Sequence, residues 1–110
     1  MPSFSKNEVI LVRYPFSDLT AAKVRPAIVV GAPHPSADCF IVPLTSRVEG
    51  LLAGEFVLTD WHAAGLNLPS AVKRGLYTIH GSLVLKSVGR LSARDGDRVE
   101  LSLRSWLGLA

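Results

Sequence analysis

The chain has 110 residues and a formal net charge of +3, and 48% of its residues are hydrophobic. This length fits one domain and leaves no room for two, so we expect residues 1–110 to form a single domain. The one cysteine, Cys39, excludes an internal disulfide and a cysteine-based zinc site. No stretch approaches the roughly 18 apolar residues of a membrane helix, and we expect a soluble, cytoplasmic protein.

The basic residues are biased toward arginine, which provides eight of the twelve. A mild basic excess is compatible with nucleic-acid binding but does not establish it. Because the planar guanidinium group of arginine matches the geometry of phosphate, the bias slightly favours a partner that carries phosphate.

Six segments have the composition of short β-strands, since they are rich in β-branched and apolar residues and are bounded by proline and glycine. They are residues 7–14, 25–32, 39–46, 55–59, 71–80 and 82–91. Pro43 lies inside the third segment and indicates an edge strand or a bulge. Gly75 predicts a bulge in the fifth segment, and Gly89 predicts a bend in the sixth.

The segments between these strands are predicted to be loops and turns. Residues 15–24 are small and polar without any period, which predicts a mobile loop, and residues 47–54 form a second loop. Residues 33–38 contain two prolines and predict a turn. Within residues 60–70 we expect one helical turn, ended by Gly65.

The hydrophobic period changes near the C-terminus. Four apolar residues recur there at helical spacing: Val99, Leu103, Trp106 and Leu107. Ser92 and Asp95 stand three apart just ahead of them, which is a capping-box pattern. These features predict one helix at roughly residues 93–107, with Trp106 on its buried face. Short strands followed by one terminal helix predict a mainly β fold, either a small barrel or a curled sheet.

Several kinds of site find little support in the sequence. The three histidines, His34, His62 and His80, are far apart in the sequence and lack the spacing of a metal-ligand pair. Their positions therefore favour surface or partly buried histidines over a metal site. No nucleophile elbow, phosphate loop or dinucleotide-binding glycine motif occurs. Cys39 opens an apolar strand and is expected to be a buried, inert thiol. We therefore predict no metal and no cofactor.

Three polar residues, Arg25, Thr45 and Ser46, stand at the ends of two predicted strands. If the strands on either side of the 33–38 turn pair antiparallel, the start of one lies beside the end of the other. The guanidinium and the hydroxyls are then expected at one rim of the sheet, where they would suit an oxyanion or a phosphate. The alternative is a structural arginine bonded to loop carbonyls, and position alone favours that alternative.

Four stretches of the chain resemble the MazF/PemK family of toxin–antitoxin endoribonucleases, in the family's order and spacing. They are VILVRYPFSDLTAAKVRPAIVV, FIVPLTSR, WHAAGLNLPSAV and VGRLS, and they cover most of the chain. The RPAIVV and VPLTS pair is the specific part of the resemblance. The resemblance implies a small SH3-like barrel with a C-terminal helix, a homodimer and an acidic cognate antitoxin. It also implies metal-independent cleavage of single-stranded RNA at short sequences.

The resemblance further implies the site residues. The family's catalytic arginine and threonine carry over to Arg25 and Thr45, and Ser46 is expected to assist. Pro26 restricts Arg25 to an extended backbone and, as the expected first residue of its strand, costs no ladder hydrogen bond. In the implied reaction the ribose 2′-OH attacks the adjacent phosphate, which gives a 2′,3′-cyclic phosphate and a 5′-OH end.

One family feature is missing from this chain. Some members carry an acidic residue in the strand predicted at 71–80, where this sequence has Lys73 and Arg74. If the reaction requires a carboxylate base, Asp18 in the loop before Arg25, or else Asp60, is the stand-in. Four basic residues are expected to contact the RNA backbone: Lys23, Arg47, Lys73 and Arg74. For Lys73 and Arg74, the interpretation as a solvated pair of surface charges fits the sequence about as well as RNA binding does.

Other interpretations of the same residues stay open. A toxin of the same fold that binds a protein such as DNA gyrase would not need Arg25 and Thr45. The missing carboxylate also leaves open an inactive RNA-binding barrel. Trp61 and Tyr77 would serve to stack on bases, although packing in a core or a dimer interface is the more common role of each.

Overall fold

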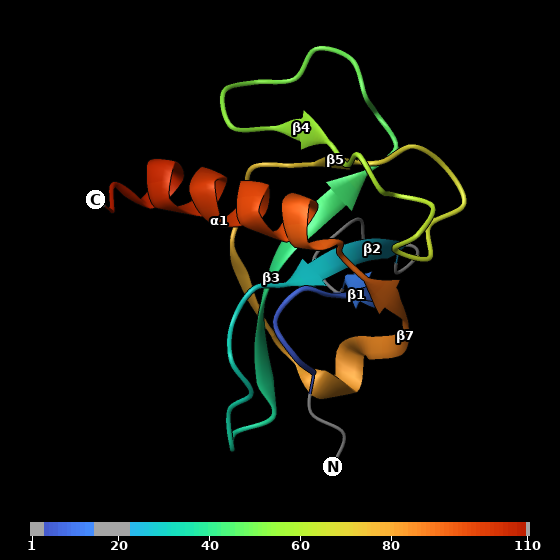
Figure 1. The fold of residues 1–110 in the computed structure, drawn as a ribbon. Helices are drawn as coiled ribbons and strands as arrows, with labels where there is room; N and C mark the ends of the chain where they lie inside the picture. The colour runs from blue at the N-terminus through green and yellow to red at the C-terminus, as the bar shows by residue number, and fades with distance from the viewer. Residues whose placement is uncertain (1–3, 15–22, 110) are drawn as a thin grey trace.

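The computed structural model describes residues 4–14 and 23–109 of the chain. Within them, seven strands, one 3₁₀ helix and one α-helix follow one another (Figure 1). They are β1 (Glu8–Tyr14), β2 (Lys23–Val29), β3 (Asp38–Thr45), β4 (Phe56–Val57), β5 (Ala71–Val72), β6 (Tyr77–His80), η1 (Gly81–Leu83), β7 (Val84–Arg90) and α1 (Ala93–Leu107). Residues 15–22, most of the predicted first loop, lie outside the described residues, and Asp18 lies among them.

The strands pair antiparallel in the order β4-β5-β3-β2-β1-β7, and β6 also pairs with β3. Figure 1 shows the sheet curling on itself, with α1 lying across one of its faces. The predicted class, mainly β with a C-terminal helix, is confirmed. Among the described residues the curled sheet is not closed into a complete barrel, because no pairing joins its outer strands β4 and β7.

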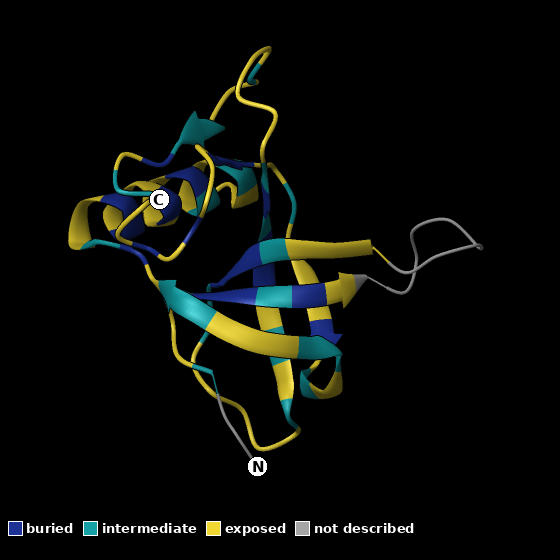
Figure 2. Ribbon diagram, turned by 90° about the vertical axis from the view of Figure 1, so that its right-hand side faces the viewer, coloured by how far each residue is buried: buried dark blue, intermediate teal, exposed yellow. Residues whose placement is uncertain are grey.

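The sheet carries a hydrophobic core on each face. One cluster lies under α1 and includes Val9, Ile28, Val42 and Val99. A second cluster includes the strand neighbours Ile10, Ala27, Val29 and Ile41. Successive residues of a strand point to opposite faces, so two covered faces require continuous apolar runs such as 27–30. Figure 2 shows the result: buried positions are concentrated in β1, β2 and β3, whereas β7 has none, and they alternate with exposed positions along α1.

Pro26 lies inside β2, because β2 begins at Lys23 and not at Arg25. The prediction that Pro26 is the first residue of its strand is therefore wrong. Its missing N–H is tolerated for a different reason. Val30 donates its N–H to the carbonyl of Phe40 in β3. Backbone N–H groups alternate in direction along a strand, so residues separated by an even number of positions point their N–H groups the same way. An N–H at position 26, four residues before Val30, would therefore also face β3. The β2–β3 ladder starts only at the next residue, and no ladder bond is lost.

Pro43 is not on an edge strand, so the first of the two alternatives predicted for it is wrong. β3 is central, with β2 on one side and both β5 and β6 on the other. On that second side β3 pairs with β6 up to Ile41 and with β5 from Leu44 onward. Pro43 falls where β3 changes partner, and its carbonyl still accepts the N–H of Lys73 at 3.0 Å. The residue without a donor therefore occupies the one break in this ladder.

The segment predicted as a single strand at 71–80 forms two strands, β5 and β6, so that prediction is wrong. The interruption contains Gly75, where only a bulge was expected. The Glu55 carboxylate accepts the N–H of Arg74 within it, at 2.9 Å, and satisfies a donor that the broken ladder leaves over. β4 holds two of the five residues predicted at 55–59, and η1 delays the start of β7.

The helix α1 covers the predicted span. The Oγ of Ser92 caps it by accepting the N–H of Asp95 at 3.3 Å. Val99 is buried, whereas Leu107 is 52% exposed, and Figure 1 shows the last turn of α1 extending past β3. Neither helix in the described part of the chain is long and apolar enough to cross a membrane.

The predicted helical turn within residues 60–70 is present. Ala64 donates its N–H to the carbonyl of Asp60 at 3.1 Å, and Gly65 ends the turn with a φ of +91°. A Cβ on Gly65 would overlap the carbonyl oxygen of Val88 in β7. Glycine therefore serves two needs here, the left-handed backbone and the close approach of this segment to β7.

Candidate active-site cleft

A cleft of about 710 Å³ opens beside the start of β2 and the end of β3. β2 contributes residues 24–26 to its lining, β3 and the residue after it contribute 44–46, and β7 contributes 86–88. Leu11 of β1 completes the strand side. Residues 65–68 and Ser70, from the segment that packs against β7, form the loop side.

The register of the β2–β3 hairpin brings Arg25 and Thr45 to this cleft together. Ala27 pairs with Pro43, and continuing that register by two residues places Arg25 level with Thr45. Both residues line the cleft, as does Ser46. The antiparallel hairpin predicted across residues 33–38 is thus present, and the chain brings the three polar residues to one rim. Their catalytic roles stay predictions.

Arg25 is exposed, and its backbone pairs with Val12 of β1. Within residues 4–14 and 23–109, its guanidinium takes part in none of the four ion pairs, Lys6–Glu100, Arg94–Asp60, Arg98–Asp95 and Arg104–Glu100. A structural arginine is ordinarily held by hydrogen bonds to carbonyls or carboxylates. The structure assigns Arg25 no such bond to another described residue, so its five donors face the cleft region without a protein acceptor from that part of the chain.

The hydroxyl of Thr45 is partly engaged. Its Oγ1 accepts the backbone N–H of Arg47 at 3.1 Å, a local turn that fixes the side chain. A hydroxyl that accepts one hydrogen bond still has its own proton to donate. Thr45 can therefore present an oriented O–H donor next to the arginine, and Ser46, which is exposed, offers a second hydroxyl.

The charged residues of the lining are all basic. Of the residues that line the cleft within the described part of the chain, Arg25 and Lys86 are cationic and none is a carboxylate. The sequence analysis missed Lys86, as well as the polar residues Asn67 and Ser70. No motif or spacing marks Lys86, because its approach to Arg25 depends on β7 pairing with β1, which is a contact between distant parts of the chain.

The four basic residues expected to bind RNA are exposed but do not line the cleft. Lys23 and Arg47 directly adjoin lining residues at either side of the hairpin rim. Lys73 and Arg74 lie in the interruption between β5 and β6. The N–H of Arg74, followed by that of Leu52, lowers the pKa of the Glu55 carboxyl by hydrogen bonding to it.

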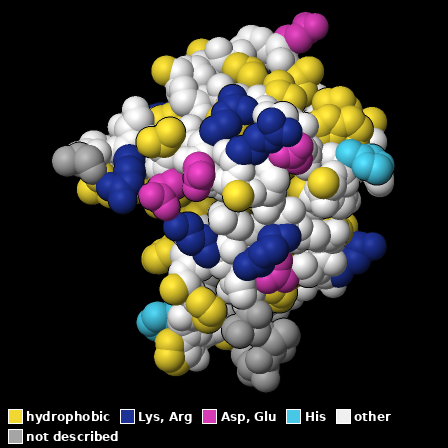
Figure 3. Space-filling model, viewed as in Figure 1, with side chains coloured by type: hydrophobic (Ala, Val, Ile, Leu, Met, Phe, Trp, Pro, Cys, Tyr) yellow, Lys and Arg dark blue, Asp and Glu magenta, His cyan; other side chains and the backbone are white. Residues whose placement is uncertain are grey.

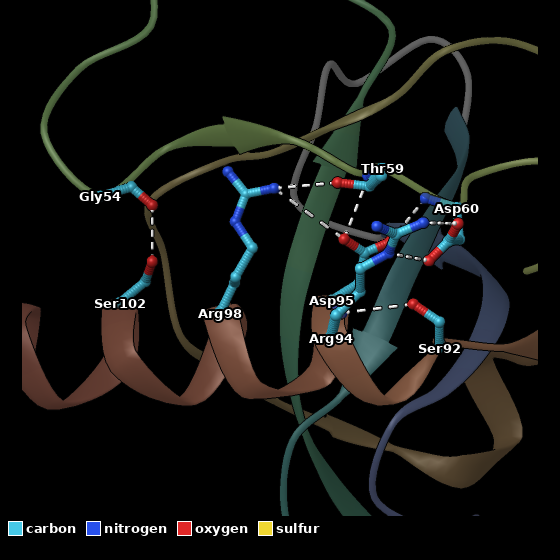
Figure 4. Close-up of polar contacts among 8 residues, drawn as sticks. All are labelled: Gly54, Thr59, Asp60, Ser92, Arg94, Asp95, Arg98 and Ser102. Carbon is cyan, nitrogen blue, oxygen red and sulfur yellow. Dashed lines mark hydrogen bonds and ion pairs between the residues drawn. The ribbon is translucent and has the colours of Figure 1, made fainter.

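Asp60, one of the two candidate bases, does not line the cleft and is engaged elsewhere. Its two carboxylate oxygens accept hydrogen bonds from the guanidinium of Arg94 at 2.8 and 3.0 Å (Figure 4). The bonds from Arg94, and then from Ser92, lower the pKa of Asp60 to about 2. A carboxylate so strongly held in its ionised form is a poor proton acceptor. The other candidate, Asp18, lies outside the described residues.

A buried carboxylate holds the loop side of the cleft in place from behind. Asp95 of α1 is fully buried and accepts the backbone N–H groups of Thr59 and Asp60 at 3.0 and 2.8 Å. Arg98 bonds the Thr59 hydroxyl at 3.2 Å and lies 4.0 Å from the centre of the Phe56 ring. Figure 4 shows these groups converging above α1. They fix the start of the segment that continues into cleft residues 65–68.

The remaining candidates have packing roles or lie elsewhere. Trp61 packs against the core cluster under α1, as the packing interpretation expected. Trp106 joins the same cluster and donates its Nε1–H to the carbonyl of Ala53 at 2.9 Å. Tyr77 is 41% exposed on β6 and does not line the cleft. Cys39 is half-buried, not buried as expected. Burial, followed by the charge of Asp38, still raises the pKa of its thiol, which suits the inert thiol that was expected.

Of the comparisons with known proteins, only the comparison with solved structures finds similar proteins. No protein-family model and no curated protein sequence matches the chain. Among solved structures, MazF of Deinococcus radiodurans in a MazE–MazF crystal is similar with a TM-score of 0.80 and 18% identity, and the match covers 100% of both chains.

Two mycobacterial structures are also similar. An endoribonuclease from a mycobacterial species matches with a TM-score of 0.77 and 17% identity, over 99% of this chain and 95% of its own. The toxin MazF-mt6 of Mycobacterium tuberculosis matches with a TM-score of 0.73 and 20% identity, over 94% of this chain and 98% of its own. Identities this low establish the fold, and the chain has the fold of the MazF toxins, as its sequence resemblance implied.

Proposed function

We propose that this protein is the toxin of a type II toxin–antitoxin system, a metal-independent endoribonuclease that cleaves single-stranded RNA at short sequences. The observation that carries the proposal is the meeting of Arg25 and Thr45 in one cleft whose described charged residues are all cationic. The fold shared with MazF toxins supports it. The protein acts in the cytoplasm as a homodimer and is held by an acidic antitoxin.

The chemistry follows from these side chains. The ribose 2′-oxygen attacks the adjacent phosphorus in line, the bond to the 5′-oxygen breaks, and the products are a 2′,3′-cyclic phosphate and a 5′-OH end. Arg25 neutralises the charge that develops on the phosphorane oxygens, because a guanidinium remains protonated throughout. Thr45 donates its O–H to one of those oxygens and fixes the geometry. The proton of the 2′-OH passes to a base that the cleft lining does not identify, and the 5′-oxygen takes up a proton on leaving.

A cleavage assay on a mixed pool of single-stranded RNA, with EDTA present, tests this proposal. Wild-type protein should cut at specific sequences and leave cyclic phosphate ends, and DNA of the same sequences should stay intact because it lacks the 2′-OH. Arg25→Ala should lower the rate by about 10³-fold or more, by analogy with other arginines that stabilise a phosphoryl transition state.

The matched control is Arg90→Ala, which removes an exposed strand arginine that does not line the cleft. It should cut like wild type, and both variants should keep the wild-type melting temperature. If the wild-type protein cuts no sequence in a diverse pool, the enzyme proposal fails. The alternative is then a toxin that binds a protein target such as DNA gyrase.

A further inference from the structure

The strand β7 adds a second cation to the cleft, at a distance from Arg25. Pro26 of β2 and Lys86 of β7 both pair with Leu11, one on each side of β1. These three residues therefore form a row across three adjacent strands, and all three line the cleft. The row shows that the cleft extends beyond the Arg25–Thr45 rim, across β1 to β7.

The length of this row sets the separation of the two cations. Neighbouring strands lie about 4.8 Å apart, so the backbones of Arg25 and Lys86, two strands apart, are separated by roughly 10 Å. When Arg25 and Thr45 hold one phosphate at the rim, the far part of the cleft can receive the next nucleotide of an extended RNA strand. A single strand of RNA presents a phosphate at every nucleotide, so a second phosphate falls within reach of the flexible lysine.

Lys86 is also available for such a contact. It is exposed, and none of the four ion pairs among the described residues involves it. Lys6 is different, because its Nζ lies 2.9 Å from a carboxylate oxygen of Glu100. No described residue of the cleft lining offers Lys86 a carboxylate, so within the described part of the chain its charge has no counter-ion.

We propose that Lys86 forms a phosphate subsite, which binds a non-scissile phosphate of the RNA strand next to the phosphate held at the Arg25–Thr45 rim. This inference rests on the proposed function. An ammonium group contacts phosphate as a point charge, and such contacts position a nucleic acid without selecting its sequence. Lys86 thus holds the strand in the cleft, whereas Arg25 acts on the reacting phosphate.

Binding of 2′-O-methyl RNA isolates this role from catalysis, because the substituted oligonucleotide lacks the attacking hydroxyl. The probe is a labelled random-sequence pool, and its affinity is measured by fluorescence anisotropy between about 50 and 200 mM salt. Lys86→Ala should weaken binding roughly 5- to 10-fold at the low-salt end and reduce the slope of log K against log salt by about 0.7, the value for one phosphate contact on a single strand. Lys86→Arg should keep most of the affinity, and Arg90→Ala, a cation on the same strand outside the cleft, should leave both quantities unchanged.

Cleavage kinetics then separate Lys86 from the reacting centre. A contact with a non-scissile phosphate is made equally in the ground state and the transition state, so Lys86→Ala should raise KM and leave kcat nearly unchanged. Arg25→Ala should lower kcat instead. If wild type binds and cuts while Lys86→Ala keeps the KM and salt slope of Arg90→Ala, the subsite is refuted and the proposed function stands. A fall in kcat at constant KM would also refute it, since Lys86 would then act on the scissile phosphate. If wild type neither cuts nor binds, both proposals fail together.

Discussion

Charged side chains lie on both sides of the segment that connects β4 to β5, and the two sides differ in how these charges are paired. Behind the segment, over α1, the Asp60 and Asp95 carboxylates are bonded to Arg94 and to backbone N–H groups. Figure 3 shows basic and acidic side chains next to one another on that face. In the cleft, on the other side, Arg25 and Lys86 have no ion-pair partner among the described residues.

This difference separates structural charges from charges available to a ligand. A buried or paired ionic group has its hydrogen bonds satisfied within the protein, and removing it leaves a partner unsatisfied. An exposed cation in a concave surface loses nothing of that kind when it is truncated. Substitutions over α1 should therefore change the free energy of unfolding, whereas substitutions in the cleft should change the handling of RNA and leave stability almost unaltered.

The largest effect on stability is expected from Asp95→Ala. This substitution leaves the N–H groups of Thr59 and Asp60 without their acceptor, in a site where Asp95 itself is 0% exposed. We expect the free energy of unfolding, measured in urea, to fall by about 3 kcal/mol. Asp95→Asn should cost less, because its remaining carbonyl oxygen can still accept one of the two bonds.

Asp97→Ala is the matched control, since Asp97 lies on the same helix and is exposed. Its effect should stay within about 0.5 kcal/mol, as for most surface substitutions. Equal effects of the Asp95 and Asp97 substitutions would show that the bonds to residues 59 and 60 do not support the loop side of the cleft.

Thr45→Val should have the opposite signature. The substitution keeps the shape of the side chain and removes the hydroxyl, so the cleavage rate should fall by roughly 10²–10³-fold, the usual cost of one oxyanion donor. The only described bond of that hydroxyl is to the exposed Arg47 N–H, so the melting temperature should change little. Thr45→Ser, which restores the donor, should recover most of the rate in the same RNA assay. A valine variant that cuts as fast as wild type would remove Thr45 from the proposed mechanism.

Features of the fold that depend on neighbouring residues could be predicted from the sequence. The helical spacing around Val99 and the cap at Ser92 gave the bounds of α1, and the turn at 33–38 gave the hairpin that brings Arg25 level with Thr45. In each case the interacting residues are close in sequence, so the sequence pattern is enough to predict how they are arranged.

Features that depend on distant pairings could not be predicted in this way. The row from Pro26 to Lys86 requires β7 beside β1, and the break at Pro43 requires β3 to change from β6 to β5. The engagement of Asp60 by Arg94 joins residues 34 positions apart. Propensity and period describe single segments, so the sequence marked Asp60 as a possible base, and only the three-dimensional arrangement assigns it to the helix.

The Asp60–Arg94 pair should give the smallest effect, confined to acid pH. The bond from Arg94 lowers the pKa of Asp60 to about 2 in the folded protein, from 3.8 as its ordinary value. Because the folded pKa is the lower one, the pair stabilises the fold fully above the ordinary value, and this contribution is lost as pH falls from about 4 toward 2. Arg94→Met should therefore reduce the urea midpoint slightly at pH 5, and its difference from wild type should disappear near pH 2. The effect is small because both groups are accessible to solvent.

The control is Arg90→Met, which removes an arginine outside the four ion pairs and should track wild type over the same pH range. A difference for Arg94→Met that persists unchanged at pH 2 would mean that Arg94 supports the segment by packing, and the contrast between paired and available charges would then not extend to this residue.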